Sequence, residues 1–482
     1  MNYFFKHFRF RNTSFLQKGE PFHDLGESAI AESNKSRKTT IIPMPKSSER
    51  NLVKSSKKMK AIKLAGTIAT ASLFVPYSSS PVTAALEESP KTIVDEVWQI
   101  VYSEFVDSEF NKVDWLNERQ KLLKKEYASE KEAYKAIRQS LKDLGDPYTR
   151  FLDPKEFEEL TSQTSGELSG VGIRLEIDKK TSALTIVEPL ENSPASSAGL
   201  QSGDRIVRIN DKPTELMTIE QASQEIKGEV GTEIKLEIAR NGKKPFDVVL
   251  ERAQIELPSV NYTLNQEGAT KVGYIKLDEF SSHAAEQMEK AIADLSEKQA
   301  SGFILDLRGN PGGLLFSSVE IARMWMAKGA IVSTIDRKGG NQKFAANGNA
   351  LTDLPLVVLV DGYSASASEI LAGALKENRR ATVVGSRTYG KGTVQSVHSL
   401  SNGSGLAVTI AQYYPPSGED INYKGIAPDI EVDLTREEQT TLSINPALIG
   451  TKADRQYARA IGILQNNVSE KIPPITPSIT VR

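Results

Sequence analysis

The stretch GFILDLRGNPGG, residues 302–313, indicates the kind of fold that this chain adopts. Its first six residues are apolar apart from one aspartate, which is typical of a strand buried on both faces, and a glycine-rich loop follows. A helix-like pattern comes next, over residues 317–327. Residues 354–360, LPLVVLV, repeat this arrangement before a second helical stretch at 369–377. We therefore expect a parallel α/β core whose ligand sites lie at the carboxyl ends of its strands.

The two loops that follow these strands carry residue types suited to acyl transfer. Successive glycines in residues 308–313 allow backbone N–H groups to converge on an anion. The second loop, DGYSASASE at 361–369, places serine hydroxyls at a helix start, where N–H groups and the helix dipole favour negative charge. Together the loops can form an oxyanion hole beside a nucleophilic serine. Each of Ser364, Ser366 and Ser368 can equally be a helix cap or a small packing residue.

A lysine is the expected activating base. The chain has no cysteine and only four histidines, and Ser–Lys pairs are an alternative to Ser–His–Asp. Lys391 lies between two glycines in YGKGTV, residues 389–394, and must be desolvated to be neutral, although a lysine in a hairpin turn is the alternative. Residues 385–391 also fit the GxxxxGK part of a P-loop. Gly392 stands where Ser or Thr should bind magnesium, however, and a β-like stretch follows, so nucleotide hydrolysis is not expected.

Composition narrows the classes of function further. The 482 residues are 39% hydrophobic and 25% charged, which indicates a multidomain protein that folds in water. The net charge of −2 does not indicate the basic surface that binds nucleic acid, and residues 85–482 taken alone are acidic. The absence of cysteine excludes thiol nucleophiles, disulfides and thiolate metal sites. No metal-binding motif occurs, so we expect neither a metal nor a cofactor.

A targeting segment precedes the part of the chain that is expected to fold. The apolar residues 64–75 follow several lysines and lead through small residues to Ala84, which is the layout of a secretory signal. These residues are fewer than the roughly 20 that a membrane-spanning helix needs. We expect an exported protein whose N-terminal extension and signal peptide occupy residues 1–84. The alternative is an uncleaved anchor, which would leave the protein associated with the membrane.

The exported chain divides into parts by pattern. Apolar spacings of three and four after Pro90 predict a helical domain, broken around Gly145 and resumed at Asp153-Pro154. Short β-branched runs separated by turns then predict a small barrel-like domain, and the α/β core follows. The expected boundaries are 85–165 for the helical domain, 166–254 for the barrel-like domain, 255–440 for the core and 441–482 for a loosely ordered C-terminal tail.

Three motifs in order resemble a known family. SASASEI at 364–370 and GKGTVQ at 390–395, with LDLRGNPGG upstream, are similar to those of the carboxyl-terminal processing proteases, the tail-specific peptidases of family S41. The resemblance implies that Ser366 is the nucleophile and that Lys391, 25 positions later, is the general base. It implies that Gln395 orients the lysine.

The resemblance also supplies the rest of the protease site. It implies an oxyanion hole formed by backbone N–H groups of Ala367 and of Gly312 or Gly313, in a core with a ClpP/crotonase-like fold. The fold class that it implies is a multidomain α+β protein with an N-terminal helical domain, a PDZ domain and this α/β protease core.

The barrel-like domain resembles a PDZ domain. Gly170-Val171-Gly172-Ile173 matches the carboxylate-binding loop of that family, and AGL at 198–200 and GDRI at 203–206 match its later signature. In such domains the N–H groups of the loop bind a terminal carboxylate while the peptide adds a strand to the sheet edge.

The resemblance implies an exported serine endopeptidase with a Ser–Lys dyad that binds protein carboxyl termini and cleaves near them. Its partners are protein or peptide substrates, including membrane-proximal ones, and not nucleic acid. Family members act in the bacterial periplasm or the thylakoid lumen, and either compartment fits a signal peptide. A catalytically silent PDZ module that binds exported proteins is the alternative. The sequence leaves the substrate and the oligomeric state open.

Overall fold

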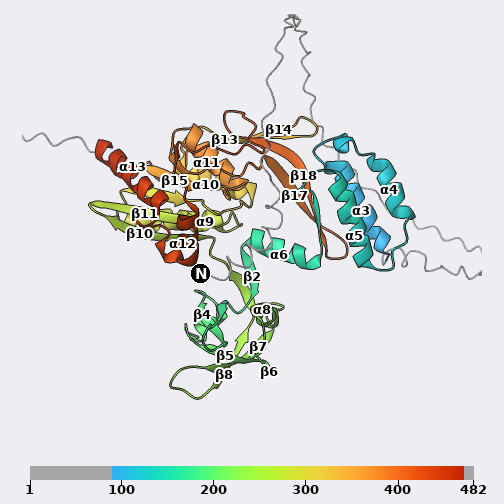
Figure 1. Ribbon diagram of the computed structural model, residues 1–482, viewed down its shortest axis with the longest axis horizontal. Helices are drawn as coiled ribbons and strands as arrows, with labels where there is room; N and C mark the ends of the chain where they lie inside the picture. Colours follow the sequence, from blue (N-terminus) through green and yellow to red (C-terminus); the bar gives the residue numbers. More distant parts are fainter. Residues whose placement is uncertain (1–88, 472–482) are drawn as a thin grey trace, which may run out of the picture. The chain divides into compact units, whose positions relative to one another are not determined.

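The computed structural model describes residues 89–471 (Figure 1). The expected signal peptide at 64–84 and the prolines at 473–477 lie outside this range. Within it, no helix combines the length and the apolar character needed to cross a membrane.

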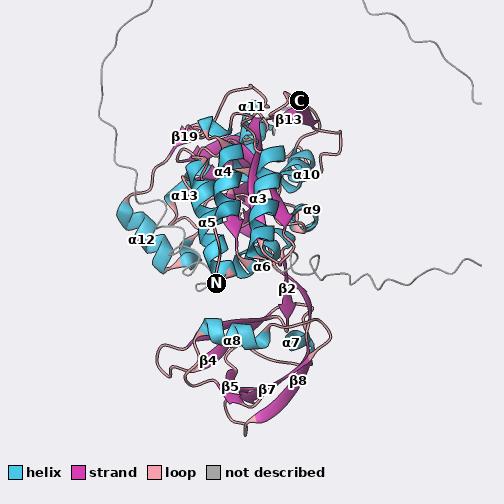
Figure 2. Ribbon diagram, turned by 90° about the vertical axis from the view of Figure 1, so that its right-hand side faces the viewer, coloured by secondary structure: helices cyan, strands magenta, loops and turns pink. Residues whose placement is uncertain are grey.

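The first described part is helical, as the sequence predicts. Helices α3, α4 and α5 pack side by side (Figure 2). Ser89 caps the first helix by accepting from the N–H of Lys91, and Asp153 forms a capping box with Glu156 at the start of the last. The helices are α3 (Pro90–Glu104), α4 (Trp115–Lys124), α5 (Glu130–Asp143) and α6 (Pro154–Ser165), with a short 3₁₀ turn at Phe110–Lys112.

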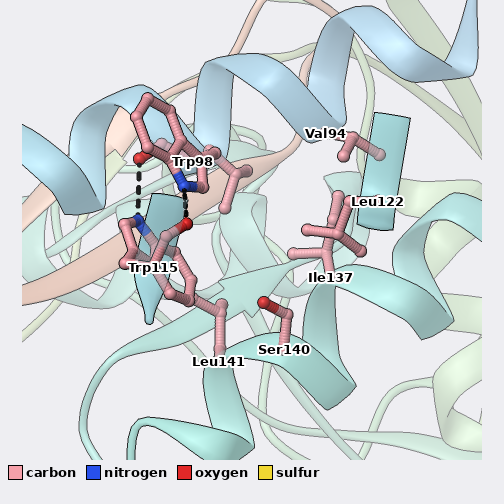
Figure 3. Close-up of a pocket in the computed structure, with 8 residues that line it drawn as sticks. Val94, Trp98, Trp115, Leu122, Ile137, Ser140 and Leu141 are labelled. Carbon is pink, nitrogen blue, oxygen red and sulfur yellow. Dashed lines mark hydrogen bonds between the residues drawn. The ribbon is translucent and has the colours of Figure 1, made fainter. Parts of the chain in front are cut away.

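Two tryptophans fix the interior of this helical domain (Figure 3). The Nε1–H of Trp98 donates to the carbonyl of Trp115 at 2.6 Å, and the Nε1–H of Trp115 donates to the carbonyl of Trp98 at 3.3 Å. Both indole N–H groups are therefore satisfied although the rings are buried. A cavity of about 10 Å³ lies beside them, and the buried Ser140 hydroxyl on its wall has no hydrogen-bond partner among the described residues. The reciprocal bonds join α3 to the start of α4.

The helical domain is packed on a five-stranded sheet that contains the longest strand of the protease core. Strand β1 pairs antiparallel with β18, with Arg150 opposite Ala407. Apolar residues of α3 to α5 share one hydrophobic cluster with Leu406 and Val408 of β18. The strands are β1 (Arg150–Leu152), β13 (Ala330–Asp336), β14 (Asn341–Ala345), β17 (Thr393–Ser399) and β18 (Gly405–Tyr414).

The next part has a strand order of β3-β4-β5-β7-β8, with the two-residue β6 beside β5. Strand β3 lies at the edge of this sheet, and helix α8 contacts it. A two-stranded ribbon of β2 and β9 closes the segment, so the chain enters and leaves it at neighbouring positions. Its elements are β2 (Glu167–Gly170), β3 (Ile173–Ile177), β4 (Leu184–Pro189), α7 (Pro194–Ser197), β5 (Arg205–Ile209), β6 (Lys212–Pro213), α8 (Ile219–Ile226), β7 (Glu233–Ala239), β8 (Phe246–Glu251) and β9 (Ala253–Glu256).

The α/β core contains a six-stranded sheet, β10-β11-β12-β15-β16-β19, in which every pairing except β10 with β11 is parallel. Alternate residues of β12 face opposite ways, so Phe303 and Leu305 join the cluster under α9 to α11 while Ile304 joins the cluster under α13. The sheet is therefore covered on both faces, as its continuous apolar strands predict. The elements are β10 (Val260–Glu267), β11 (Thr270–Leu277), α9 (Ala284–Glu297), β12 (Gly302–Asp306), α10 (Leu315–Trp325), β15 (Leu356–Val360), α11 (Ala367–Glu377), β16 (Thr382–Gly385), β19 (Ile430–Glu431), α12 (Arg436–Ile444) and α13 (Arg455–Lys471).

The C-terminal end differs from the expectation that a loosely ordered tail begins at residue 441. Helix α13 packs on the sheet through Tyr457, Ala460, Ile461 and Leu464, which lie on one helical face. The core thus continues at least to Leu464. The apolar spacing of α13 is present in the sequence, but it stands directly before prolines that are typical of a loose tail.

A buried ion-pair network fastens the start of α13 to the end of β12. The Arg308 guanidinium donates to both carboxylate oxygens of Asp454, at 3.0 and 2.7 Å, and to Asp306 at 2.6 and 2.9 Å. Tyr274 also donates to Asp306. Arg308 is 8% exposed and both carboxylates are 0% exposed, so one guanidinium is shared by two carboxylates away from water. The Nζ atom of Lys276, 3.9 Å from Oδ1 of Asp306, supplies a second positive charge.

We expect Asp454→Ala to lower the free energy of unfolding by about 3 kcal/mol, because the buried Arg308 would lose one of its two counter-charges. Urea denaturation measures this. Glu437→Ala, which removes an exposed carboxylate from α12, is the matched control and should change it by less than about 0.5 kcal/mol. Equal, small effects for both variants would contradict the role given to this network.

Candidate active site

Ser366 occupies the turn between strand β15 and helix α11. Its backbone has φ 54° and ψ −113°, a conformation that residues with a side chain rarely adopt. Such a turn from strand to helix presents a side chain at the carboxyl end of a parallel sheet. The residue is partly exposed, whereas Ala365 and Ala367 on either side are buried. The positive φ is thus found at a residue that meets solvent.

The three serines of the motif differ in what their hydroxyls do. The Ser364 hydroxyl donates to the carbonyl of Leu307 at 2.9 Å, and the Ser368 hydroxyl donates to the carbonyl of Asn310 at 3.0 Å. Both side chains are fully buried, so they join the second loop to the glycine-rich loop. The Ser366 hydroxyl donates to no acceptor among residues 89–471. It is available to a substrate.

A buried carboxylate holds the serine turn and the lysine loop together. Oε2 of Glu369 accepts from the backbone N–H groups of Ser366 and Lys391, both at 2.9 Å. Oε1 accepts from the N–H of Gly390 at 2.7 Å and from the hydroxyl of Thr388 at 2.6 Å. Burial raises the pKa of this carboxyl, while the four hydrogen bonds act in the opposite direction. Because one oxygen binds both backbones, Ser366 and Lys391 are neighbours across 25 residues of sequence.

The Lys391 amine occupies a desolvated place, as its proposed chemistry requires. Burial, and secondarily the positive charge of Arg150, lowers its pKa to about 8, whereas Asp146 and Glu369 act to raise it. The Nζ atom lies 4.8 Å from the centre of the Tyr148 ring. No carboxylate within the described residues forms a salt bridge with it. A substantial fraction of the amine is therefore neutral near pH 8.

Gln395 lies on β17, opposite Thr409 of β18. Its Nε2 donates to the hydroxyls of Thr393 at 2.9 Å and Thr409 at 3.2 Å. These two bonds fix the amide plane. Within the described part of the chain its Oε1 accepts no hydrogen bond, so that oxygen remains available as an acceptor.

Two backbone segments meet beside Ser366. The N–H of Ala367 has no acceptor among the described residues, because it belongs to the first turn of α11. A Cβ on Gly312 would lie 2.9 Å from the Cβ of Ser366, which is why only glycine fits this approach. The N–H of Gly312 donates to Oδ1 of Asn310 at 2.8 Å, whereas that of Gly313 has no acceptor within residues 89–471.

The loop Gly170 to Ile173 joins β2 to the edge strand β3. Gly172 has φ 72°, and its carbonyl accepts from the N–H of Leu190 at 2.8 Å. The N–H groups of Val171 and Gly172 have no acceptor in the described part of the chain. The loop therefore presents unoccupied donors beside an unpaired strand edge.

Comparisons with known proteins identify two domains of this chain. A model of peptidase family S41 matches residues 271–432, and a model of the PDZ domain matches residues 185–240. A carboxyl-terminal-processing protease of Synechocystis sp. is 41% identical over 393 residues, covering 81% of this chain and 90% of the relative. The chain is a carboxyl-terminal processing protease of family S41. It is thus a serine peptidase with a PDZ domain, as the sequence motifs predict.

Further relatives are found in plants and among solved structures. The chloroplastic carboxyl-terminal-processing peptidase 3 of Arabidopsis thaliana is 38% identical, covering 76% of this chain and 73% of the relative. A solved structure described as a photosystem II D1 C-terminal processing protease is 34% identical, covers 71% of this chain and 93% of its own, and has a TM-score of 0.44.

Sequence reasoning did not single out Glu369 or the helical-domain residues around the lysine. A signal for Glu369 was present, because Ser366 and Glu369 have the S-x-x-E spacing of a capping box. For Asp146 and Tyr148 the sequence held no comparable signal, since they lie more than 200 residues before Lys391. Residues 89–471 contain no group of three or more His, Asp or Glu side chains suited to a metal ion.

Proposed function

We propose that this protease is exported and cleaves proteins near their carboxyl termini with Ser366 as nucleophile and Lys391 as general base. The observation that carries the proposal is the pairing of a hydroxyl with no acceptor and a desolvated amine on two loops that the Glu369 carboxylate ties together. Ser364 and Ser368 are already engaged with backbone carbonyls.

In the proposed mechanism, neutral Lys391 takes the proton of the Ser366 hydroxyl as its oxygen attacks the carbonyl carbon of the scissile bond. The oxygen of that carbonyl becomes negative and accepts from the N–H of Ala367 and from that of Gly313, because the N–H of Gly312 is already bonded to Asn310. The lysine ammonium then gives its proton to the leaving amine, which leaves an acyl-enzyme. Water, deprotonated by Lys391, then attacks this ester, and the lysine ammonium returns the proton to the departing Ser366 oxygen, which releases the product acid and restores the free enzyme.

Gln395 has a positioning role in this mechanism. Two threonine hydroxyls hold its amide nitrogen, so its Oε1 can accept an N–H of the Lys391 amine. That bond would turn the lone pair of the neutral amine toward the serine.

We further propose that the PDZ domain, residues 166–254, binds the carboxyl terminus of the substrate. The donors at Val171 and Gly172 suit a carboxylate, with the peptide lying along the edge of β3 beside α8. This arrangement favours proteins and peptides with a free C-terminus, including those that end near a membrane.

Export follows from the sequence of residues 64–84, which lies outside the described residues. The relatives come from a cyanobacterium and from a plant, where the protein is described as chloroplastic. The proposed location is therefore the periplasm or the thylakoid lumen.

We expect Ser366→Ala to lower kcat by about 10⁴-fold or more, because no other hydroxyl can form the acyl-enzyme. Ser364→Ala and Ser368→Ala each remove one buried hydrogen bond, worth about 1 kcal/mol of stability, and should keep a substantial part of the activity. Peptide cleavage by the three purified variants measures this. An inactive Ser364→Ala variant beside an active Ser366→Ala variant would reverse the assignment.

Activity should rise with pH through about 8, because deprotonation of Lys391 creates the base. The pH dependence of kcat/KM measures this limb, which should persist in His398→Ala and His283→Ala. Lys391→Arg should be inactive, since a guanidinium remains protonated and cannot accept the serine proton. A fully active Lys391→Arg variant would exclude lysine as the base.

Amidation of a substrate's terminal carboxylate should weaken turnover, mainly by raising KM, because the PDZ loop would lose its anionic ligand. Matched peptides with free and amidated ends measure this by kcat and KM. Equal cleavage of both peptides would assign the PDZ domain another role.

A further inference from the structure

A segment of the helical domain forms one wall of the lysine site. The ring of Tyr148 lies 4.8 Å from Nζ of Lys391, which is within the range of a cation–π contact when the amine is protonated. Both side chains are half-buried. Tyr148 belongs to the turn between α5 and β1, so the contact joins the helical domain to the catalytic loop.

Sheet geometry explains why this turn reaches the lysine. Strand β18 pairs with β1 of the helical domain and with β17, which begins two residues after Lys391. The Thr409 hydroxyl of β18 donates to Oδ2 of Asp146 at 2.6 Å and accepts from Gln395 at 3.2 Å. The Thr409 N–H donates to the hydroxyl of Thr149 at 3.1 Å. The turn is therefore fixed to the same strand that positions the lysine-orienting glutamine.

We propose that Tyr148 and Arg150 of the helical domain are positioning residues for Lys391, so that packing of this domain against β18 completes the catalytic base. The inference rests on the proposed function, in which Lys391 accepts the serine proton. Tyr148 keeps water from one side of the amine, and Arg150 disfavours its charged form.

The charges around the amine make this proposal specific. Arg150, two residues after Tyr148, pairs with Ala407 of β18, and its exposed guanidinium is the cation that acts to lower the Lys391 pKa. Asp146 of the same turn and Glu369 of α11 act to raise it. The Tyr148 phenol is neutral at physiological pH, because burial together with the proximity of Tyr389 and Tyr423 raises its pKa. Arg150 therefore acts against two carboxylates that stabilise the ammonium.

The test is a charge series at position 150 with the full chain. Arg150→Lys keeps the charge and should leave the pH of the rising limb of kcat/KM unchanged. Arg150→Gln should move this limb to higher pH by about 0.5 unit, and Arg150→Glu should move it further in the same direction. At pH 7 the Arg150→Gln variant should then be about threefold slower, with an unchanged plateau at high pH. A merely structural defect would lower the plateau as well. The matched control is Arg436→Gln, an exposed arginine of α12, which should leave the limb unmoved.

Tyr148 is tested in the same assay. Tyr148→Phe keeps the ring, so the rising part of the pH profile of kcat/KM should stay at the same pH. Tyr148→Ala should move this rising part to higher pH, because burial is the largest cause of the lowered Lys391 pKa. The loss of the cation–π contact acts in the opposite direction, and we expect the gain in hydration of the amine to outweigh it.

A readout independent of catalysis separates this inference from the proposed function. In the Ser366→Ala background, brief labelling with acetic anhydride across a pH series, followed by mass spectrometry of the peptide that contains Lys391, reports the titration of its amine. If the labelling curve and the activity limb shift together in the order Lys, Gln, Glu, the proposal is supported. A labelling curve that does not respond to the charge at position 150 overturns the inference. A curve that shifts while the activity limb stays fixed supports the contact and overturns Lys391 as the base.

Discussion

The buried carboxylate of Glu369 is the interaction on which the site depends. Its two oxygens accept four hydrogen bonds, and one oxygen binds the backbone of both Ser366 and Lys391. A buried carboxylate is costly to desolvate, and here the donors that offset the cost belong to the two loops that must meet. Relative motion of the loops would leave an unsatisfied carboxylate. The geometry of the serine and the lysine is thereby coupled to the stability of the core.

The strained backbone at Ser366 is held in the same way. A residue with φ 54° persists only where its surroundings fix it from several directions. The hydroxyl of the buried Tyr413 donates to the Ser366 carbonyl at 3.1 Å, Glu369 accepts from its N–H, and Gly312 packs against its Cβ. Contacts to the backbone and Cβ hold the turn, and the hydroxyl is left without an acceptor. Preorganisation of this kind holds the Ser366 hydroxyl in place without a rearrangement of its loop.

Much of this fold is visible in the sequence, because it rests on local patterns. The apolar runs at 302–307 and 354–360 predict the strands of a covered parallel sheet, and β12 and β15 lie there. The motifs give the family, and the structure adds that two of the three serines are engaged elsewhere. Long-range partners are not visible in this way. The S-x-x-E spacing indicates the bond of Glu369 to Ser366, but nothing local in the sequence indicates its bonds to residues 388–391 or the contact of Tyr148 with Lys391. The apolar face of α13 is present in the sequence, but prolines typical of a loose tail follow it.

The pairing of β1 with β18 also bears on how the protein is made. Thr149 and Thr409, which meet where these strands pair, are 260 residues apart in sequence, so this contact has to await synthesis of nearly the whole chain. Until then the lysine loop lacks the wall that the helical domain supplies. The helical domain is made first, but its place against the protease core exists only once residue 409 has been added.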